Sequence, residues 1–89
     1  MLEREIESIV CKYAEQQGWL QYKFTSPSNR GVPDRLFLKN GKIIFIEFKA
    51  PGKKLTRLQN HIIKKIRLQG FTTEVIDDTT IGKSLFKRK

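Results

Sequence analysis

Two acidic residues and a lysine lie on either side of the dipeptide Asn40-Gly41. Asp34 precedes the dipeptide, and Glu47 and Lys49 follow it. Asn-Gly is the strongest short signal for a two-residue β-hairpin turn, because both turn positions require a positive φ. Counting outward from the turn places Asp34 opposite Glu47, and Lys49 shares their face because residues two apart in a strand point the same way. The sequence therefore predicts two carboxylates and an amine at one end of one hairpin face.

This arrangement suits the binding of a divalent cation. Directly opposed side chains have Cβ atoms about 4.5–5.5 Å apart, so Asp34 and Glu47 would repel each other unless a cation joins them. Mg²⁺ prefers oxygen ligands, usually one or two carboxylates with waters and phosphate oxygens, and the Phe48 carbonyl could add another. A cation there would polarise a phosphate, and Lys49 could orient or help deprotonate the attacking water, or offset transition-state charge. The predicted chemistry is phosphodiester hydrolysis; the alternative is a solvated hairpin end in which Lys49 simply bridges the two carboxylates.

Around the hairpin, the pattern of apolar residues predicts elements in the order α-β-β-β-α-β. Helices are expected over residues 2–17 and 55–69, strands over 19–25, 33–39, 42–49 and 71–76, and a short helical segment over 81–86 before the basic tail 87–89. The hairpin register pairs Lys39 with Lys42, Leu38 with Ile43, and Leu36 with Phe45.

Apolar side chains at helical spacing mark the faces expected to be buried. They are Leu2, Ile6, Ile9, Val10 and Tyr13 in the first helix, and Leu55, Leu58, Ile62, Ile63 and Ile66 in the second. We expect the strand aromatics Trp19, Tyr22 and Phe24 in the core rather than stacked on bases. The tail residues Ile81, Leu85 and Phe86 could either close the core or form a subunit interface, and the sequence leaves both open.

The chain is short and strongly basic. Its 89 residues include 18 Lys and Arg against 9 Asp and Glu, which gives a net charge of +9. This size predicts one domain over residues 1–89, and the charge favours a polyanionic partner, most simply nucleic acid, over a merely soluble basic surface. Cys11 and His61 are the only residues of their types, which excludes an intrachain disulfide and disfavours a Cys- or His-based zinc site. Without a membrane-length apolar run or a signal peptide, we expect a cytosolic protein with no membrane partner.

The short motifs resemble a known group of nucleases. Pro33-Asp34, followed after a gap by Glu47-Phe48-Lys49, looks like the PD-(D/E)XK nuclease superfamily. The longer strings over residues 29–35 and 46–52, with the later Gln59, resemble the VRR-Nuc family more closely, and this resemblance spans nearly the whole chain. It implies an α/β fold with a restriction-endonuclease-like core in the order α-β-β-β-α-β, whose mixed central sheet is flanked by helices.

The resemblance also implies roles for individual residues. Carried over by position, Asp34 and Glu47 are the metal ligands, Lys49 is the catalytic lysine, and Gln59 is a helix glutamine near the active site. A surface glutamine is the alternative for Gln59.

Superfamily members also place a first-helix glutamate near the metal, and two residues compete for that role. Glu3 and Glu7 lie one turn apart along the same edge of the apolar stripe. The spacing of Glu7 to Gly18 matches the superfamily pattern better, so Glu7 is preferred as a catalytic and metal-binding residue.

Basic residues surround the predicted site. Arg30 and Arg35 bracket Asp34 in sequence, and Lys53, Lys54 and Arg57 follow Lys49 at the start of the second helix. We expect these cations to bind phosphates, which positions nucleic acid without reading its sequence. Because no segment resembles a base-reading helix, cutting directed by DNA structure is more plausible than cutting directed by sequence.

The resemblance implies a Mg²⁺- or Mn²⁺-dependent endonuclease acting on branched DNA. Stand-alone VRR-Nuc proteins, typical of phages, look like dimeric nucleases that resolve four-way (Holliday) junctions. Cutting both strands symmetrically needs two sites, hence a homodimer. The alternatives are a nonspecific, flap or duplex nuclease with the same site, and a non-catalytic nucleic-acid-binding module. No small-molecule cofactor is expected, and the expected location is the cytoplasm of a bacterium or a phage-infected host.

Overall fold

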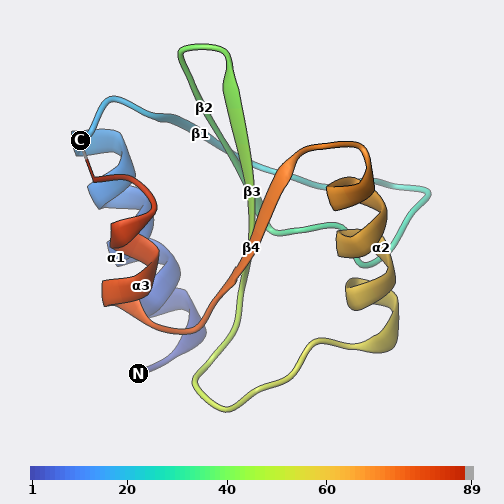
Figure 1. Ribbon diagram of the computed structural model, residues 1–89. Helices are drawn as coiled ribbons and strands as arrows, with labels where there is room; N and C mark the ends of the chain where they lie inside the picture. The colour runs from blue at the N-terminus through green and yellow to red at the C-terminus, as the bar shows by residue number, and fades with distance from the viewer. Residues whose placement is uncertain (88–89) are drawn as a thin grey trace.

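The computed structural model, drawn in Figure 1, describes residues 1–87 and confirms the predicted order of elements. The elements are α1 (Glu3–Gln16), β1 (Leu20–Lys23), β2 (Arg35–Lys39), β3 (Lys42–Phe48), α2 (Arg57–Leu68), β4 (Thr72–Ile76) and α3 (Thr79–Ser84). The short last helix begins two residues earlier than predicted, because the Asp78 side chain accepts a hydrogen bond from the Ile81 amide and caps it. The expected basic tail lies partly outside the described residues.

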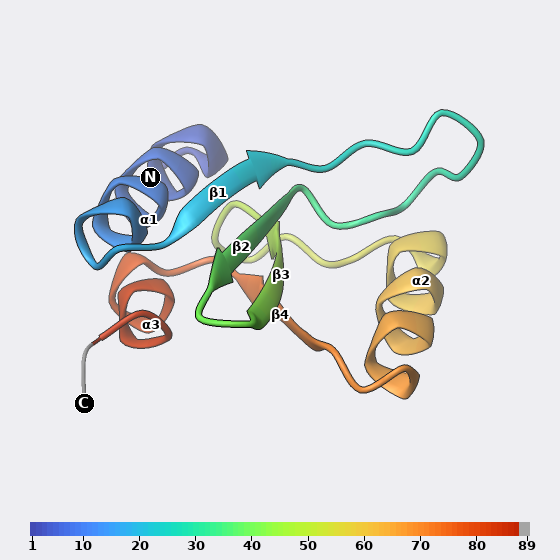
Figure 2. The same ribbon diagram turned by 90° about the horizontal axis from the view of Figure 1, so that it is seen from above.

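The four strands form one mixed sheet in the order β1-β2-β3-β4. The first two pairings are antiparallel, and β4 returns parallel to β3 through the crossover that contains α2. Figure 1 views the sheet nearly edge-on, with α1 and α3 on one side and α2 on the other, and Figure 2 shows the same layers from above. The predicted mixed sheet flanked by helices is therefore confirmed.

The hairpin has the predicted register. Lys39 pairs with Lys42, Leu38 with Ile43, and Leu36 with Phe45. Asn40 and Gly41 have φ values of 49° and 78°, as a two-residue turn of this type requires.

The paired part of the hairpin ends at Arg35 and Ile46, so β2 is shorter than the predicted strand over residues 33–39. Counting from the turn, residue 33 would form a hydrogen-bonded pair with Phe48. Proline has no N–H to donate in such a pair, and the ladder stops before it.

The core lies between the sheet and the layer formed by α1 and α3. Its members are Ile6, Val10, Cys11 and Ala14 of α1, Phe37, Ile46, Phe48 and Ile76 of the sheet, and Phe86. Phe86 contacts both Phe37 and Trp19, with ring centroids 4.8 and 5.2 Å away. Of the two roles left open for the tail, Phe86 therefore closes the core, whereas Ile81 is exposed.

The opposite face of the sheet is only partly covered by α2. Within α2 only Ile63 is fully buried, and Leu58 is exposed, contrary to the predicted apolar stripe. Leu2 is also exposed, because it precedes α1 as its N-cap. The prediction of Tyr22 as a core residue is wrong: Tyr22 lies on the face away from α1, where no helix of residues 1–87 covers β1, and 56% of its surface is exposed.

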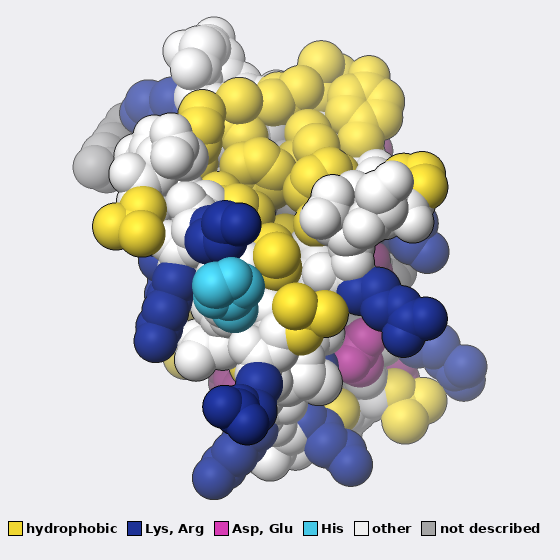
Figure 3. All heavy atoms as spheres, turned by 90° about the vertical axis from the view of Figure 1, so that its right-hand side faces the viewer, with side chains coloured by type: hydrophobic (Ala, Val, Ile, Leu, Met, Phe, Trp, Pro, Cys, Tyr) yellow, Lys and Arg dark blue, Asp and Glu magenta, His cyan; other side chains and the backbone are white. Residues whose placement is uncertain are grey.

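We define the uncovered sheet face by Leu20, Tyr22, Leu36, Leu38, Ile43, Phe45 and Phe71. The strand residues share this face through the register, and Phe71 lies 6.2 Å from Phe45 between ring centroids. Figure 3 looks onto the α2 side of the molecule, where hydrophobic side chains gather at the hairpin-turn end while Lys, Arg and acidic side chains lie below them. Among residues 1–87, no helix is long and apolar enough to cross a membrane.

Candidate active site

The structure brings Asp34, Glu47, Lys49 and Gln59 together at the end of the hairpin opposite its turn. Asp34 directly precedes β2, Glu47 is the next-to-last residue of β3, and Lys49 follows β3. Glu47 points to the α2 side of the sheet because it alternates with Ile46 and Phe48, which fill the core on the α1 side. The alternation of one strand thus separates the polar site from the core.

Glu47 is the most buried charged residue of the site. Only 3% of its surface is exposed. Its Oε2 accepts a hydrogen bond from Gln59 Nε2 at 3.2 Å and lies 3.9 Å from Lys49 Nζ. Its Oε1 is buried and has no hydrogen-bond partner among the described residues. A buried carboxylate oxygen without a donor is unfavourable, so this atom is a vacant acceptor for a cation or water.

Burial is also the main reason that the pKa of Glu47 is raised to about 7. The neighbouring charge of Asp34 raises this pKa further, while Lys49 opposes the shift. Asp34 is therefore close enough to disfavour the ionised form of Glu47.

Asp34 supplies the acceptor for the Phe48 amide at the end of the hairpin, where the Pro33 carbonyl would accept if the ladder continued. Its Oδ2 accepts a hydrogen bond from the Phe48 amide at 2.8 Å, and its own carbonyl accepts one from the Phe24 amide at 2.9 Å. Burial raises the pKa of the Asp34 carboxyl, and the Phe48 N–H works in the opposite direction.

The same strand ending affects the Phe48 carbonyl. In the hairpin register the Phe48 carbonyl points toward residue 33. The following N–H, that of Lys49, points the other way, to β4, and donates a hydrogen bond to the Ile76 carbonyl at 2.9 Å. Pro33 cannot donate a hydrogen bond to the Phe48 carbonyl. That oxygen is therefore left for another partner beside Asp34.

Gln59 reaches the site from the first turn of α2. The helix begins two residues later than predicted, because Thr56 caps it: Thr56 Oγ1 accepts from the Gln59 amide at 3.1 Å, and Gln59 Oε1 accepts from the Thr56 amide at 3.0 Å. Thr-x-x-Gln is a capping-box pattern, so the sequence carried a signal for Thr56 that the prediction missed.

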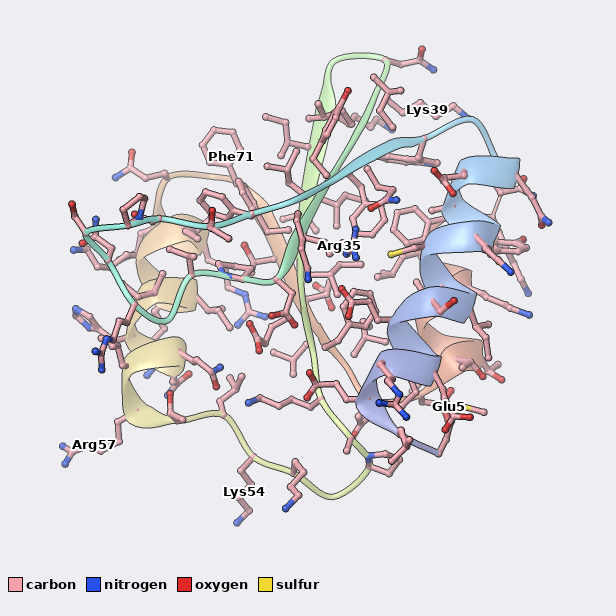
Figure 4. The ribbon with its side chains drawn as sticks, turned by 180° about the vertical axis from the view of Figure 1, so that it is seen from behind. Glu5, Arg35, Lys39, Lys54, Arg57 and Phe71 are labelled. Carbon is pink, nitrogen blue, oxygen red and sulfur yellow. The ribbon has the colours of Figure 1, made fainter. Side chains whose placement is uncertain are left out.

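Glu7 of α1 is held by Arg35. Glu7 Oε2 lies 2.6 Å from Arg35 Nε, and Arg35 Nη1 donates to Gln21 Oε1 at 2.6 Å. The charge of Glu7 raises the pKa of both Asp34 and Glu47, although less than burial does. Glu3 raises the pKa of Glu47 more than Glu7 does, but it is not a cause for Asp34. The structure thus uses Arg35, labelled in Figure 4, to join β1, β2 and α1. The sequence analysis did not predict a role for Gln21. The one signal for it is that Gln21 lies two residues before Lys23, which pairs with Arg35 across the two strands.

The other predicted phosphate-binding residues are exposed. Lys53, Lys54 and Arg57 lie at the entrance to α2, and Figure 4 shows Lys54 and Arg57 pointing away from the body of the protein. Arg30 is exposed in the loop between β1 and β2.

The donor set fits a divalent cation that takes part of its shell from outside the protein. Residues 1–87 contain no group of three or more His, Cys, Asp or Glu side chains placed to hold a metal. The unpartnered Glu47 Oε1, the Asp34 carboxylate and the Phe48 carbonyl are hard oxygens of the kind that Mg²⁺ and Mn²⁺ bind, with waters or phosphate oxygens completing the shell.

Comparison with known proteins agrees with this geometry. No protein-family model matches the chain. A protein of Acyrthosiphon pisum secondary endosymbiont phage 1, named "Putative nuclease p44", is 42% identical over 84 residues that cover 93% of this chain and 90% of that protein.

Two solved structures share the fold. One, a "VRR_NUC domain", has a TM-score of 0.86 at 25% identity and covers 93% of this chain and 91% of its own. The other, a "VRR_NUC domain protein", has a TM-score of 0.78 at 17% identity and covers 96% of this chain and 84% of its own. The second likeness supports the fold alone. The phage relative and the first structure together show that the chain belongs to the VRR-Nuc family and is a nuclease of that type.

Proposed function

We propose that the protein is a divalent-metal-dependent endonuclease that hydrolyses phosphodiester bonds in branched DNA, and that it acts as a homodimer on four-way junctions. The observation that carries the catalytic part is Glu47: a buried carboxylate beside Asp34, with one oxygen that no described residue satisfies. We treat residues 1–89 as one nuclease domain. Its proposed location is the cytoplasm of a bacterium or a phage-infected host.

In this proposal Asp34, Glu47 and the Phe48 carbonyl hold Mg²⁺ or Mn²⁺. Glu7 takes the first-helix role in preference to Glu3, since its charge raises the pKa of both carboxyls, whereas Glu3 raises the pKa of Glu47 more than Glu7 does but is not a cause for Asp34. The bound cation would neutralise the carboxylates and polarise the scissile phosphate.

The remaining side chains of the site orient the reactants. The Lys49 ammonium, 3.9 Å from Glu47, hydrogen-bonds the attacking water or a phosphate oxygen and offsets the negative charge that develops on the phosphate. Gln59 holds Glu47 Oε2 and leaves Oε1 free to act as a ligand.

The exposed cations position the DNA backbone. Lys53 and Lys54 lie between Lys49 and α2, Arg57 is the first residue of α2, and Arg30 precedes Gly31, which contacts α2. Each phosphate that these cations neutralise adds affinity without sequence preference. Arg35 contributes less directly, because its guanidinium is engaged by Glu7 and Gln21.

The uncovered sheet face supports the homodimer. Leu20, Tyr22 and Phe71 are 58, 56 and 43% exposed, and a contiguous apolar area of this kind is typical of a protein interface. If a second copy binds, two chains of net charge +9 can meet only where few of their basic residues oppose each other, and this apolar face meets that condition. The hydrophobic area in Figure 3 is the part of that view where Lys and Arg are sparse.

The substrate is tested by incubating the protein with labelled four-way junction, flap and plain duplex, each with Mg²⁺, Mn²⁺ or a chelator. We expect paired symmetric nicks in the junction and little cutting of the duplex. Equal cutting of all three would leave a nonspecific nuclease, and binding without cutting in any metal would favour a non-catalytic module. Sedimentation at the assay concentration reports whether the active species is a dimer.

A further inference from the structure

The loop between β1 and β2 contacts the first turn of α2 at Gly31. Gly31 has a φ of +85°, and a Cβ atom added to it would lie 3.0 Å from Leu58 Cγ and 3.2 Å from both Gln59 N and Leu58 C. Two of these three atoms belong to the helix backbone, so they could move away only if the turn moved. Gly31 therefore allows an approach of loop and helix that a side chain would prevent.

The turn that Gly31 contacts carries the residue that binds Glu47. α2 packs against β4, at the opposite edge of the sheet from β1, where this loop begins. Gln59 Nε2 is already at 3.2 Å from Glu47 Oε2, near the upper end of a normal hydrogen bond. A displacement of the turn by a few tenths of an ångström would weaken this bond.

Thr56 fixes which end of the Gln59 amide faces the site. The Thr56 N–H donates to Gln59 Oε1 at 3.0 Å, and Thr56 Oγ1 accepts from the Gln59 backbone at 3.1 Å. With its oxygen bound to a donor, the amide must present its NH₂ group to Glu47, which is the group that a carboxylate can accept. A flipped amide would oppose two oxygens.

We propose that Gly31 and Thr56 are positioning residues for the nuclease site: Gly31 sets the distance from the first turn of α2 to Glu47, and the Thr56 hydroxyl, by capping that turn, keeps the Thr56 N–H in place to orient the Gln59 amide. Neither residue touches the reacting atoms. Their effect on cleavage rests on the proposed function, but their effect on the Gln59 amide does not.

The first test uses heteronuclear NMR spectra of the metal-free protein. The side-chain NH₂ signal of Gln59 is identified by its loss in Gln59→Ala. We expect this signal to shift in Gly31→Ala and in Thr56→Ala, and to return in Thr56→Ser, which restores the hydroxyl. The matched control is Gly70→Ala: Gly70 has a φ of +91° but no atom within 4 Å of an added Cβ, so it carries the backbone strain without the contact. An unchanged Gln59 signal in Gly31→Ala would overturn the role of Gly31, and an unchanged signal in Thr56→Ala would overturn the role of Thr56.

The second test is a double-mutant cycle on junction cleavage. In the wild-type background, Gly31→Ala should lower kcat about three- to tenfold with little change in KM, while Gly70→Ala stays close to wild type. In the Gln59→Ala background, Gly31→Ala should have almost no further effect, because the interaction it perturbs is already gone. Losses that multiply would contradict a role through Gln59. If Gly31→Ala unfolds, Thr56→Ala and Thr56→Ser carry the same cycle, and if the wild type cuts no DNA, the proposed function fails while the NMR test still decides this one.

Discussion

At the scale of single residues, the site depends on a carboxylate that the fold alone leaves unsatisfied. Glu47 is buried, next to Asp34, and one of its oxygens has no partner among the described residues. Such a group destabilises the protein unless a donor or the proposed cation binds it. This makes the site measurable through stability as well as through cleavage.

The first prediction concerns pH. Because burial raises the pKa of Glu47 to about 7 in the folded protein, and an unfolded glutamate titrates near 4.3, the folded state holds a proton that the unfolded state has lost. Without metal, the free energy of unfolding should therefore fall as the pH rises between these values, by about 2 kcal/mol from pH 5 to pH 7.5. Denaturant unfolding in a chelator measures this.

Glu47→Gln should remove most of that slope. A smaller slope should remain, because the pKa of Asp34 is also raised. The exposed Glu15 offers the matched control Glu15→Gln, which should behave as wild type. Equal slopes in wild type and Glu47→Gln would show that Glu47 is not the buried acid described above.

The second prediction concerns the cation. Mn²⁺ or Mg²⁺ should raise the thermal unfolding temperature of the wild type at neutral pH, since a ligand that binds only the folded state stabilises it. The increase should vanish in Asp34→Asn and Glu47→Gln. Glu7→Gln should need more metal for the same increase than Glu3→Gln, and the reverse order would assign the first-helix role to Glu3.

At the scale of elements, local signals in the sequence predicted what is local in the structure. Asn40-Gly41 fixed the hairpin register, and the sequence pattern located both ends of every helix and strand to within two residues. The end of β2 depended on which hydrogen-bonding position Pro33 would occupy. The bond from Arg35 to Glu7 joins residues 28 positions apart, which no local pattern encodes.

Exposure was the least predictable property. Tyr22 and Leu58 have the spacing of core residues, but they are exposed because α2 covers only part of the sheet. Whether a face is buried depends on which distant element covers it. The sequence predicted the site residues that lie near the hairpin. The hydrogen bonds between Thr56 and Gln59 were not predicted, because they depend on the exact residue at which α2 starts.

The third prediction belongs to the uncovered sheet face. Tyr22→Glu would place a charge in the apolar interface of the proposed homodimer, so sedimentation should show a shift from dimer to monomer. The matched control Leu2→Glu changes an equally exposed apolar residue that precedes α1. A wild-type monomer at assay concentration, or a Tyr22→Glu dimer of unchanged affinity, would contradict this interface.

At the scale of the whole molecule, the charge of +9 sets how the protein meets DNA. Replacing Lys53, Lys54 and Arg57 together by alanine should weaken junction binding and reduce the slope of log affinity against log salt by about 2–3. The control triple replaces the exposed Arg4, Lys12 and Lys42, which lie on α1 and at the hairpin turn. Titrations at several salt concentrations compare the two, and an equal loss in both would mean that charge alone, rather than its position at α2, determines binding.

The most direct test of the central claim is the single-turnover rate of four-way junction cleavage by wild type and Asp34→Asn in Mn²⁺ or Mg²⁺. If Asp34 and Glu47 hold the catalytic cation, Asp34→Asn should be slower by about a thousandfold or more, and the wild type in chelator should be equally inactive. Folding of the variant is checked by its unfolding transition. Cleavage by Asp34→Asn within about tenfold of wild type, or cleavage by the wild type in chelator, would contradict the claim.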